Sequence, residues 1–266
     1  MLPTFKPWEE LTISDNYMFQ LVMQNPKLCK YLLEKILKIK IKDLKFPEYE
    51  KTIRSGLKYK SIRLDVYVEE QEGRIFDIEM QCADLGRKNL AKRSFMYQSM
   101  IASEQLRKGA RYEELNPIFV IFICTFDVFG LGYPVYEFDN TCKRNRDILL
   151  ENEVNTIFLN SKGVDNAEDP DIAAFLSYVD GKAARENFTK EIDREIQNIK
   201  LQEGRRKEYM LLSQEIEMMK DDLLEKGHAE GLNDAVLRLL SKGHTPESVA
   251  EDLDLSLQDV LKLVKK

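Results

Sequence analysis

Hydrophobic and polar residues alternate strictly along two neighbouring runs of the chain, residues 62–69 and 76–81. The apolar positions of the second run are separated by Asp77, Glu79 and Gln81. Two alternating runs joined by a short segment that contains glycine are the pattern of a β-hairpin. The sequence therefore predicts a hairpin with one apolar face and one polar face.

The register of this hairpin follows from its loop. A three-residue loop, 71–73, with Gly73 in the left-handed conformation, places Asp65 directly opposite Glu79, with Cβ atoms about 4.5–5.5 Å apart. Two facing carboxylates repel each other, whereas a divalent cation between them would make the pair favourable. The alternative is a solvated outer face on which arginine side chains balance the acids.

Helical spacing of apolar residues predicts three helices around the hairpin. They begin near Thr12 or Ser14, at Pro26 and at Gly86. The third is expected to end at Gly109, a favourable C-cap residue. Arg93 and Tyr97 lie four residues apart in this helix and therefore share a face.

Further strands follow this helix. The run PIFVIFICTF, which starts at Pro117, is almost entirely apolar and predicts a central strand buried on both faces. Val135–Phe138 and Asn155–Leu159 predict two more strands. Together these elements predict an α/β fold whose central mixed β-sheet is flanked by helices.

The chain changes character after Asn160. A segment rich in Gly, Asp and Asn precedes residues that are helical throughout. We expect three parts: an α/β domain at 1–165, a helical extension at 166–240 and a small helical pair at 241–266. The stretch 207–226 carries apolar residues at a spacing near 3.5, which suits either packing within the chain or a short coiled coil in a homodimer.

The last helical pair has the outline of a helix-turn-helix. Thr245 and Pro246 give the first helix an N-cap and a first-turn proline, and Ser256 offers a cap for the second. Such units bind DNA, but here the second helix carries only Lys262 and Lys265. A structural helical pair is the favoured interpretation, because DNA readers carry a stronger basic footprint.

Charge is distributed unevenly along the chain. The net charge is −6, yet Lys27–Arg63 contains twelve Lys or Arg against four Asp or Glu, and Gly86–Arg111 contains seven against one. Both basic segments flank the hairpin, and the C-terminal half is acidic. This arrangement predicts a local surface that binds a polyanion.

Composition excludes several other classes. The chain has no apolar run long enough to span a bilayer and no basic-then-apolar start, so we expect a cytoplasmic protein without a membrane partner. Its four cysteines show no CxxC spacing and it has two histidines, so no zinc site is expected.

Five short motifs in a fixed order connect these observations to a known family. They are SDNYMF, RLDVYV, IEMQ, KRSFMYQS and KGARYEELNPIFVIFIC. Their order and spacing resemble the recombination-promoting nuclease / putative transposase family of the PD-(D/E)XK nuclease superfamily, over about residues 11–160. The resemblance implies a restriction-endonuclease-like core followed by an all-helical C-terminal region.

The resemblance also implies roles for individual residues. Asp65 and Glu79 would be catalytic acids that bind the metal, and Asp15 would be the N-terminal acidic position of the family. Gln81 would be the third catalytic residue, where the wider superfamily has lysine. Arg93 and Tyr97 would lie close to the substrate phosphates.

The implied activity is hydrolysis of DNA phosphodiester bonds by an endonuclease that uses Mg²⁺, for which Mn²⁺ could substitute, in recombination or mobile-element biology. Because Gln81 cannot supply positive charge or act as a base at neutral pH, the alternative is a DNA-binding or protein-interaction module that cuts weakly or not at all. An RNase remains open, since a metal site addresses the phosphate and not the sugar.

Overall fold

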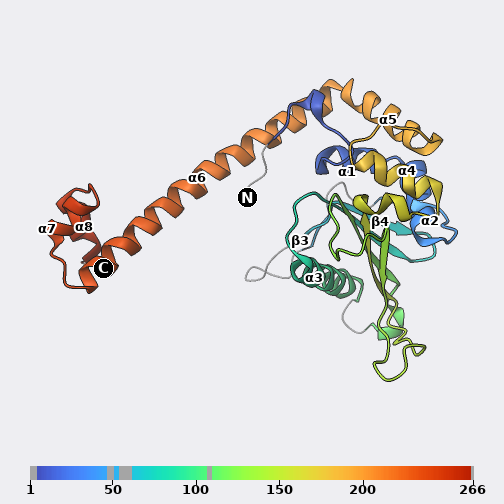
Figure 1. Cartoon of the computed structure of the whole chain (residues 1–266), viewed down its shortest axis with the longest axis horizontal. Coiled ribbons are helices and arrows are strands. Elements are labelled where there is room, and N and C mark those ends of the chain that lie inside the picture. The colour runs from blue at the N-terminus through green and yellow to red at the C-terminus, as the bar shows by residue number, and fades with distance from the viewer. Residues whose placement is uncertain (1–4, 47–50, 54–61, 107–109, 265–266) are drawn as a thin grey trace. The chain divides into compact units, whose positions relative to one another are not determined.

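The computed structural model describes residues 5–46, 51–53, 62–106 and 110–264 (Figure 1). One compact unit spans Lys6–Arg205, and a second contains the C-terminal helices from Arg206 onward. The α/β domain predicted at 1–165 is thus only part of the first unit, because helices after residue 165 also pack into it.

The elements follow one another in the order helices, hairpin, helix, strands, helices. In chain order they are η1 (Trp8–Glu10), α1 (Asn16–Met23), α2 (Pro26–Leu37), β1 (Leu44–Lys45), β2 (Thr52–Ile53), β3 (Ile62–Arg63), β4 (Val66–Glu70), β5 (Ile75–Gln81), α3 (Arg87–Gln105), η2 (Tyr112–Glu114), β6 (Ile118–Cys124), β7 (Val135–Phe138), β8 (Val154–Asn160), η3 (Ser161–Asn166), α4 (Pro170–Val179), α5 (Asn187–Lys200), α6 (Glu203–Ser241), α7 (Pro246–Asp252) and α8 (Leu257–Val264).

A mixed sheet forms the centre of the first unit. Within the described residues it has six strands in the order β1-β4-β5-β6-β8-β7. Strands β5, β6 and β8 are parallel, and β4 and β7 run antiparallel to their neighbours. The apolar run of β6 lies at the middle of this sheet and Phe122 is fully buried there, as the sequence predicts for a strand covered on both faces.

Helices cover both faces of the sheet. On one face α3 packs through Leu90, Tyr97 and Ile101 against Val120 and Phe122 of β6. Helices α1, α2, α4 and α5 pack against one another away from α3 (Figure 1). The predicted α/β architecture with a helical C-terminal region is confirmed. Both faces of the hairpin are therefore buried.

The predicted hairpin register is confirmed. Val66 pairs with Ile78 and Val68 pairs with Phe76, which is the register that a 71–73 loop dictates. The loop is closed by the Glu70 N–H, which donates to the Arg74 carbonyl at 2.8 Å. At the end of the loop Gly73 adopts a φ of +99°, the conformation that such loops require of their last residue.

We expect Gly73→Ala to destabilise the first unit by about 1–2 kcal/mol, because a side chain is strained in this conformation. A Cβ at Gly73 would also lie 2.4 Å from Oδ1 of Asn116. Urea unfolding measures the change. Gly204→Ala is the control, since Gly204 has open space around it and lies in the first turn of α6. Equal midpoints for Gly73→Ala and the wild type would contradict the proposed strain.

Two helix boundaries differ from prediction, the start of α1 and the end of α3, which lies at Gln105. Helix α1 begins at Asn16 because a turn precedes it, in which the Thr12 N–H donates to Oδ2 of Asp15 at 2.8 Å. The Asp15 carboxylate thus reaches back to Thr12 as in a capping box, but the helix starts one residue after Asp15. The predicted C-cap at Gly109 lies outside the described residues.

The stretch 161–170 is more ordered than its linker-like composition predicts. It forms η3, and Asp169 then caps α4 by accepting from the N–H groups of Asp171 and Ile172. Gly163 packs tightly here, since a Cβ at that position would lie 2.6 Å from the backbone of Tyr133. Tertiary packing thus makes this segment a fixed connection between β8 and α4.

The second unit has its own small apolar core. Val236 of α6, Val249 of α7 and Val260 of α8 are fully buried together. The predicted caps are present, since Thr245 Oγ1 accepts from the Ser248 N–H and Ser256 Oγ accepts from the Asp259 N–H. Of the helices that the structure describes, none combines the length and the apolar character needed to cross a membrane.

Candidate active site

Asp65 and Glu79 lie side by side at the carboxyl end of the parallel strands. The Asp65 N–H donates to Oε1 of Glu79 at 2.9 Å, and the Met80 N–H donates to Oδ2 of Asp65 at 3.2 Å. Only 6% of Asp65 and 3% of Glu79 are exposed. The predicted cross-strand neighbours are therefore adjacent, but the solvated outer face that was the alternative is wrong, because helices cover it.

Helix α1 supplies a partner that the sequence pattern did not reveal. Gln20 donates from Nε2 to Oδ1 of Asp65 at 3.0 Å, and it is itself buried. This bond orients the Asp65 carboxylate from the side opposite the strand. A single glutamine among the apolar residues of α1 carries no signal of this contact.

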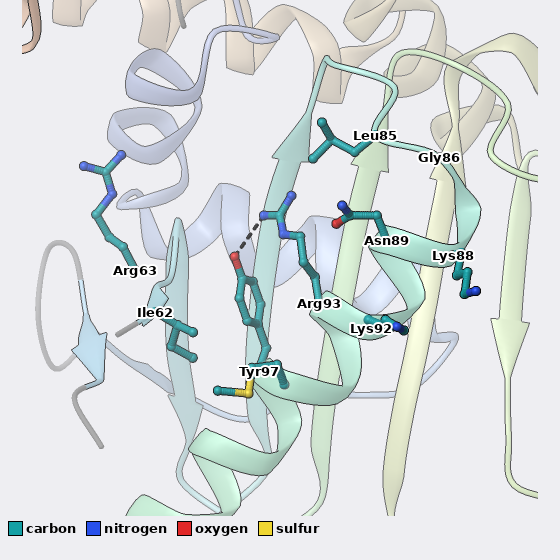
Figure 2. A pocket seen from close by; sticks show the side chains of 10 residues that line it. Ile62, Arg63, Leu85, Gly86, Lys88, Asn89, Lys92, Arg93 and Tyr97 are labelled. Carbon is teal, nitrogen blue, oxygen red and sulfur yellow. Dashed lines mark hydrogen bonds between the residues drawn. The ribbon is translucent and has the colours of Figure 1, made fainter. Parts of the chain in front are cut away.

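Arg93 connects the carboxylate pair to helix α3. Its guanidinium donates to Oε2 of Glu79 at 3.2 Å, to Oε1 of Gln81 at 2.7 Å and to the Tyr97 hydroxyl at 2.9 Å. Figure 2 shows the Arg93 and Tyr97 side chains directed toward each other. The structure thus brings together five of the six residues singled out from the sequence.

These contacts fix the charge state of the Arg93–Tyr97 pair. Burial disfavours the charged guanidinium, but Tyr97, Glu79 and Asp65 outweigh burial and raise the pKa of Arg93. Burial and then the charge of Glu79 raise the pKa of Tyr97 to about 12. Arg93 therefore stays charged and Tyr97 stays protonated at neutral pH.

Asp77 is a site residue that the sequence interpretation missed. It lies two residues before Glu79 on the same face of β5 and is fully buried. Within the described chain neither of its carboxylate oxygens accepts from an N–H group or a hydroxyl, and the Glu79 carboxyl is its polar neighbour. The signal was present in the sequence, because Asp77 occupies a polar position of the same alternating run.

Burial and mutual repulsion disfavour the charged forms of the three buried acids Asp65, Asp77 and Glu79. Burial raises the pKa of Asp65 to about 6. Burial, followed by the charges of Asp77 and Asp65, raises the pKa of Glu79 well above its usual range. Burial and the Asp65 charge do the same to Asp77. Buried carboxylates shifted in this way are typical of functional sites.

The donor chemistry fits a hard divalent cation. Asp65 and Glu79 offer carboxylate oxygens, each with a lone pair left after the bonds described above. Across the described ranges, no three His, Cys, Asp or Glu side chains converge closely enough to hold a metal. Mg²⁺ suits such a site, because it is held by one or two carboxylates and takes its other ligands from water and substrate phosphate.

Asp15 has other partners in this structure. Its Oδ1 forms an ion pair with Lys6 at 2.8 Å, and its Oδ2 accepts from the Thr12 hydroxyl at 3.0 Å. Its neighbour Ser14 contacts the segment that follows β5, since Cys82 Sγ donates to the Ser14 carbonyl at 2.9 Å. A direct metal contact from Asp15 stays a prediction.

The protein holds the Gln81 amide at both its oxygen and its nitrogen. Its Oε1 accepts from Arg93, and its Nε2 donates to the Ala83 carbonyl. The positive charge that a lysine would bring to this position is supplied from the neighbouring helix by Arg93. Gln81 therefore acts as a fixed acceptor that orients the guanidinium.

The mixed sheet, its flanking helices and the acidic pair, with Asp65 directly before β4 and Glu79 in the adjacent β5, define a PD-(D/E)XK nuclease fold. Residues 16–169 match the model of the PD-(D/E)XK nuclease family transposases, and the chain belongs to this family. The match begins directly after Asp15. No curated protein matches the chain. No solved structure matches it either.

Proposed function

We propose that this protein is a metal-dependent DNA endonuclease that hydrolyses phosphodiester bonds in recombination or in the movement of mobile elements. The observation that carries the proposal is the buried pair Asp65–Glu79, whose charge is only partly balanced by Arg93. Membership of a nuclease-fold transposase family supports it. Asp65 and Glu79 would hold Mg²⁺, which when bound polarises the scissile phosphate and activates a water.

The chain's own residues would do the remaining work. Gln20 and the Met80 N–H hold the Asp65 carboxylate in place. Arg93, charged and oriented by Gln81 and Tyr97, would bind a non-bridging phosphate oxygen, for which the planar guanidinium fork is suited. Burial and the neighbouring charges raise the pKa of Asp65 and of Glu79, so a cation bound between them would favour the state in which both acids are ionised.

Plasmid nicking tests this function. With Mg²⁺ or Mn²⁺ the wild type should convert supercoiled DNA to open circles, and Asp65→Ala should lose this activity. Asp147→Ala, which removes an exposed carboxylate in the β7–β8 loop, is the matched control and should nick like the wild type. Nicking that survives Asp65→Ala would overturn the assignment of the site.

A second candidate function is a nuclease-fold module that binds nucleic acid without cutting it. The observation that favours it is the ion pair between Arg93 and Glu79, which competes with a cation for the same carboxylate. No nicking with either metal, together with binding that weakens with salt, would support this candidate. An RNA arm in the same assay separates DNase from RNase activity.

We also propose a homodimer formed through α6. Its central stretch exposes Met218, Met219, Leu223 and Leu224, each more than half exposed. Such apolar side chains at near-heptad spacing suit a short coiled coil. Sedimentation of the wild type against Leu223→Glu tests this assembly.

A cytoplasmic location is part of the proposed function, since the expected substrate is cellular DNA.

A further inference from the structure

A cavity of about 740 Å³ opens beside the carboxylate pair, between helix α3 and strand β3 (Figure 2). Its wall includes Arg93 and Tyr97, and Arg93 also contacts Glu79 and Gln81. The Arg93 side chain therefore connects the cavity to the acidic pair. A volume of this size lies in the range of pockets that hold small organic ligands.

One part of the cavity wall is cationic. Arg63, Lys88, Lys92 and Arg93 line it, and no acidic residue is among its described lining residues. Lys88 and Lys92 are exposed and form no ion pair with any residue that the structure describes. Ammonium groups without partners beside a guanidinium favour phosphate.

The other part of the wall is apolar. Ile62, Leu85 and Met96 line it, and Leu85 is 47% and Met96 36% exposed. The free energy of the complex falls when a flat, poorly hydrated group covers apolar side chains that are exposed to solvent. Together the wall offers contacts for a phosphate and for a base, which are two of the three parts of a nucleotide.

A base in a regular duplex cannot make these contacts, because it is stacked and paired inside the helix. Only a nucleotide that is unpaired or turned out of the stack exposes its base to an apolar wall. A duplex would engage the cationic part alone and leave Leu85 and Met96 uncovered.

We propose that the cavity between α3 and β3 holds one unstacked nucleotide next to the phosphate at the acidic pair, so that the enzyme prefers unpaired DNA over intact duplex. The inference rests on the proposed function, since it assumes that the phosphate beside the cavity belongs to DNA. It assigns substrate selection to Leu85 and Met96, which lie outside the catalytic residues.

Binding measured without cleavage tests the proposal. Fluorescence anisotropy in EDTA compares a labelled mixed-sequence 14-nucleotide single strand with the duplex of the same sequence. The wild type should bind the single strand at least fivefold more tightly. Met96→Glu should weaken single-strand binding at least tenfold and duplex binding less than threefold, because a carboxylate in the apolar wall removes the contact for an unstacked base, which only the single strand provides.

Two further variants complete the test. Ser103→Glu introduces the same charge on the exposed side of α3, two turns beyond Met96 and outside the cavity lining, and should change both affinities less than threefold. Leu85→Glu changes the same apolar part of the wall from the segment before α3 and should reproduce Met96→Glu, which covers the case in which Met96→Glu does not fold.

Equal affinity for single strand and duplex, or equal weakening by Met96→Glu and Ser103→Glu, would overturn the proposal. Because the assay contains EDTA, its result is independent of catalysis. If the wild type does not nick plasmid DNA, only the proposed endonuclease function is overturned. If the wild type does not prefer the single strand, only the proposed nucleotide site is overturned.

Discussion

Glu79→Gln is expected to lower the rate of metal-dependent nicking by about two to three orders of magnitude, since losing one ligand removes about 3–4 kcal/mol of transition-state stabilisation. In EDTA at pH 8 the same variant should be more stable to urea than the wild type. Glu79 is buried next to Asp65 and Asp77, and its charged form is disfavoured in the fold. A neutral amide removes this repulsion.

The size of the stability gain follows from the pKa. Each unit by which folding raises the pKa of a carboxyl group costs about 1.4 kcal/mol of stability when that group is charged. Glutamine keeps an oxygen that can accept from the Asp65 N–H, so the backbone contact survives.

The matched control is Glu113→Gln, which makes the same chemical change at an exposed position of η2. It should leave both nicking and stability at wild-type values. A Glu79→Gln variant that is inactive but also less stable than the wild type in EDTA would contradict the idea that the acids are held together against their repulsion.

The stability of the metal-free protein should fall as pH rises from about 4 to about 6. Asp65 has a folded pKa of about 6 against an ordinary value of 3.8. In this window the folded state therefore binds more protons than the unfolded state, and raising the pH favours unfolding. The shift corresponds to about 3 kcal/mol. The raised pKa values of Glu79 and Asp77 extend the fall to higher pH.

The difference between Asp65→Asn and the wild type isolates this contribution. Urea unfolding in EDTA from pH 4 to 7 should show the variant gaining on the wild type as pH rises. Carboxylates with lowered pKa values, such as Asp127 and Asp171, act in the opposite direction and cancel in the difference. Mg²⁺ should raise the melting temperature of the wild type at pH 8 but not that of Asp65→Asn. A flat difference curve would contradict the predicted shift.

Local sequence patterns were sufficient to predict the relative positions of several site residues. The alternation of residues 62–81 and the position of Gly73 determined which face and which register Asp65 and Glu79 occupy, because side chains in a strand alternate with period two. The four-residue spacing of Arg93 and Tyr97 likewise determined that they share a helix face. Both geometries are found in the structure.

Contacts between distant segments were not readable from these patterns. Gln20 and Asp65 are 45 residues apart and meet only because α1 packs at the end of the hairpin. The polar face of the hairpin is buried because α3 lies over it, which also buries Asp77 beside Glu79. Periodicity predicts which face of a helix or strand is apolar and which is polar. It does not predict which other element packs against that face.

The opposed carboxylates of the hairpin are thus a property of the sequence alone, since strand geometry and loop length place Asp65 beside Glu79 in any fold that keeps the hairpin. What only the tertiary structure decided is their environment. Helices α1 and α3 remove the acids from water, bring Gln20 and Arg93 to them and open a cavity beside them. Burial is the largest cause of the raised pKa values of the pair, because charge is costly where water has been excluded.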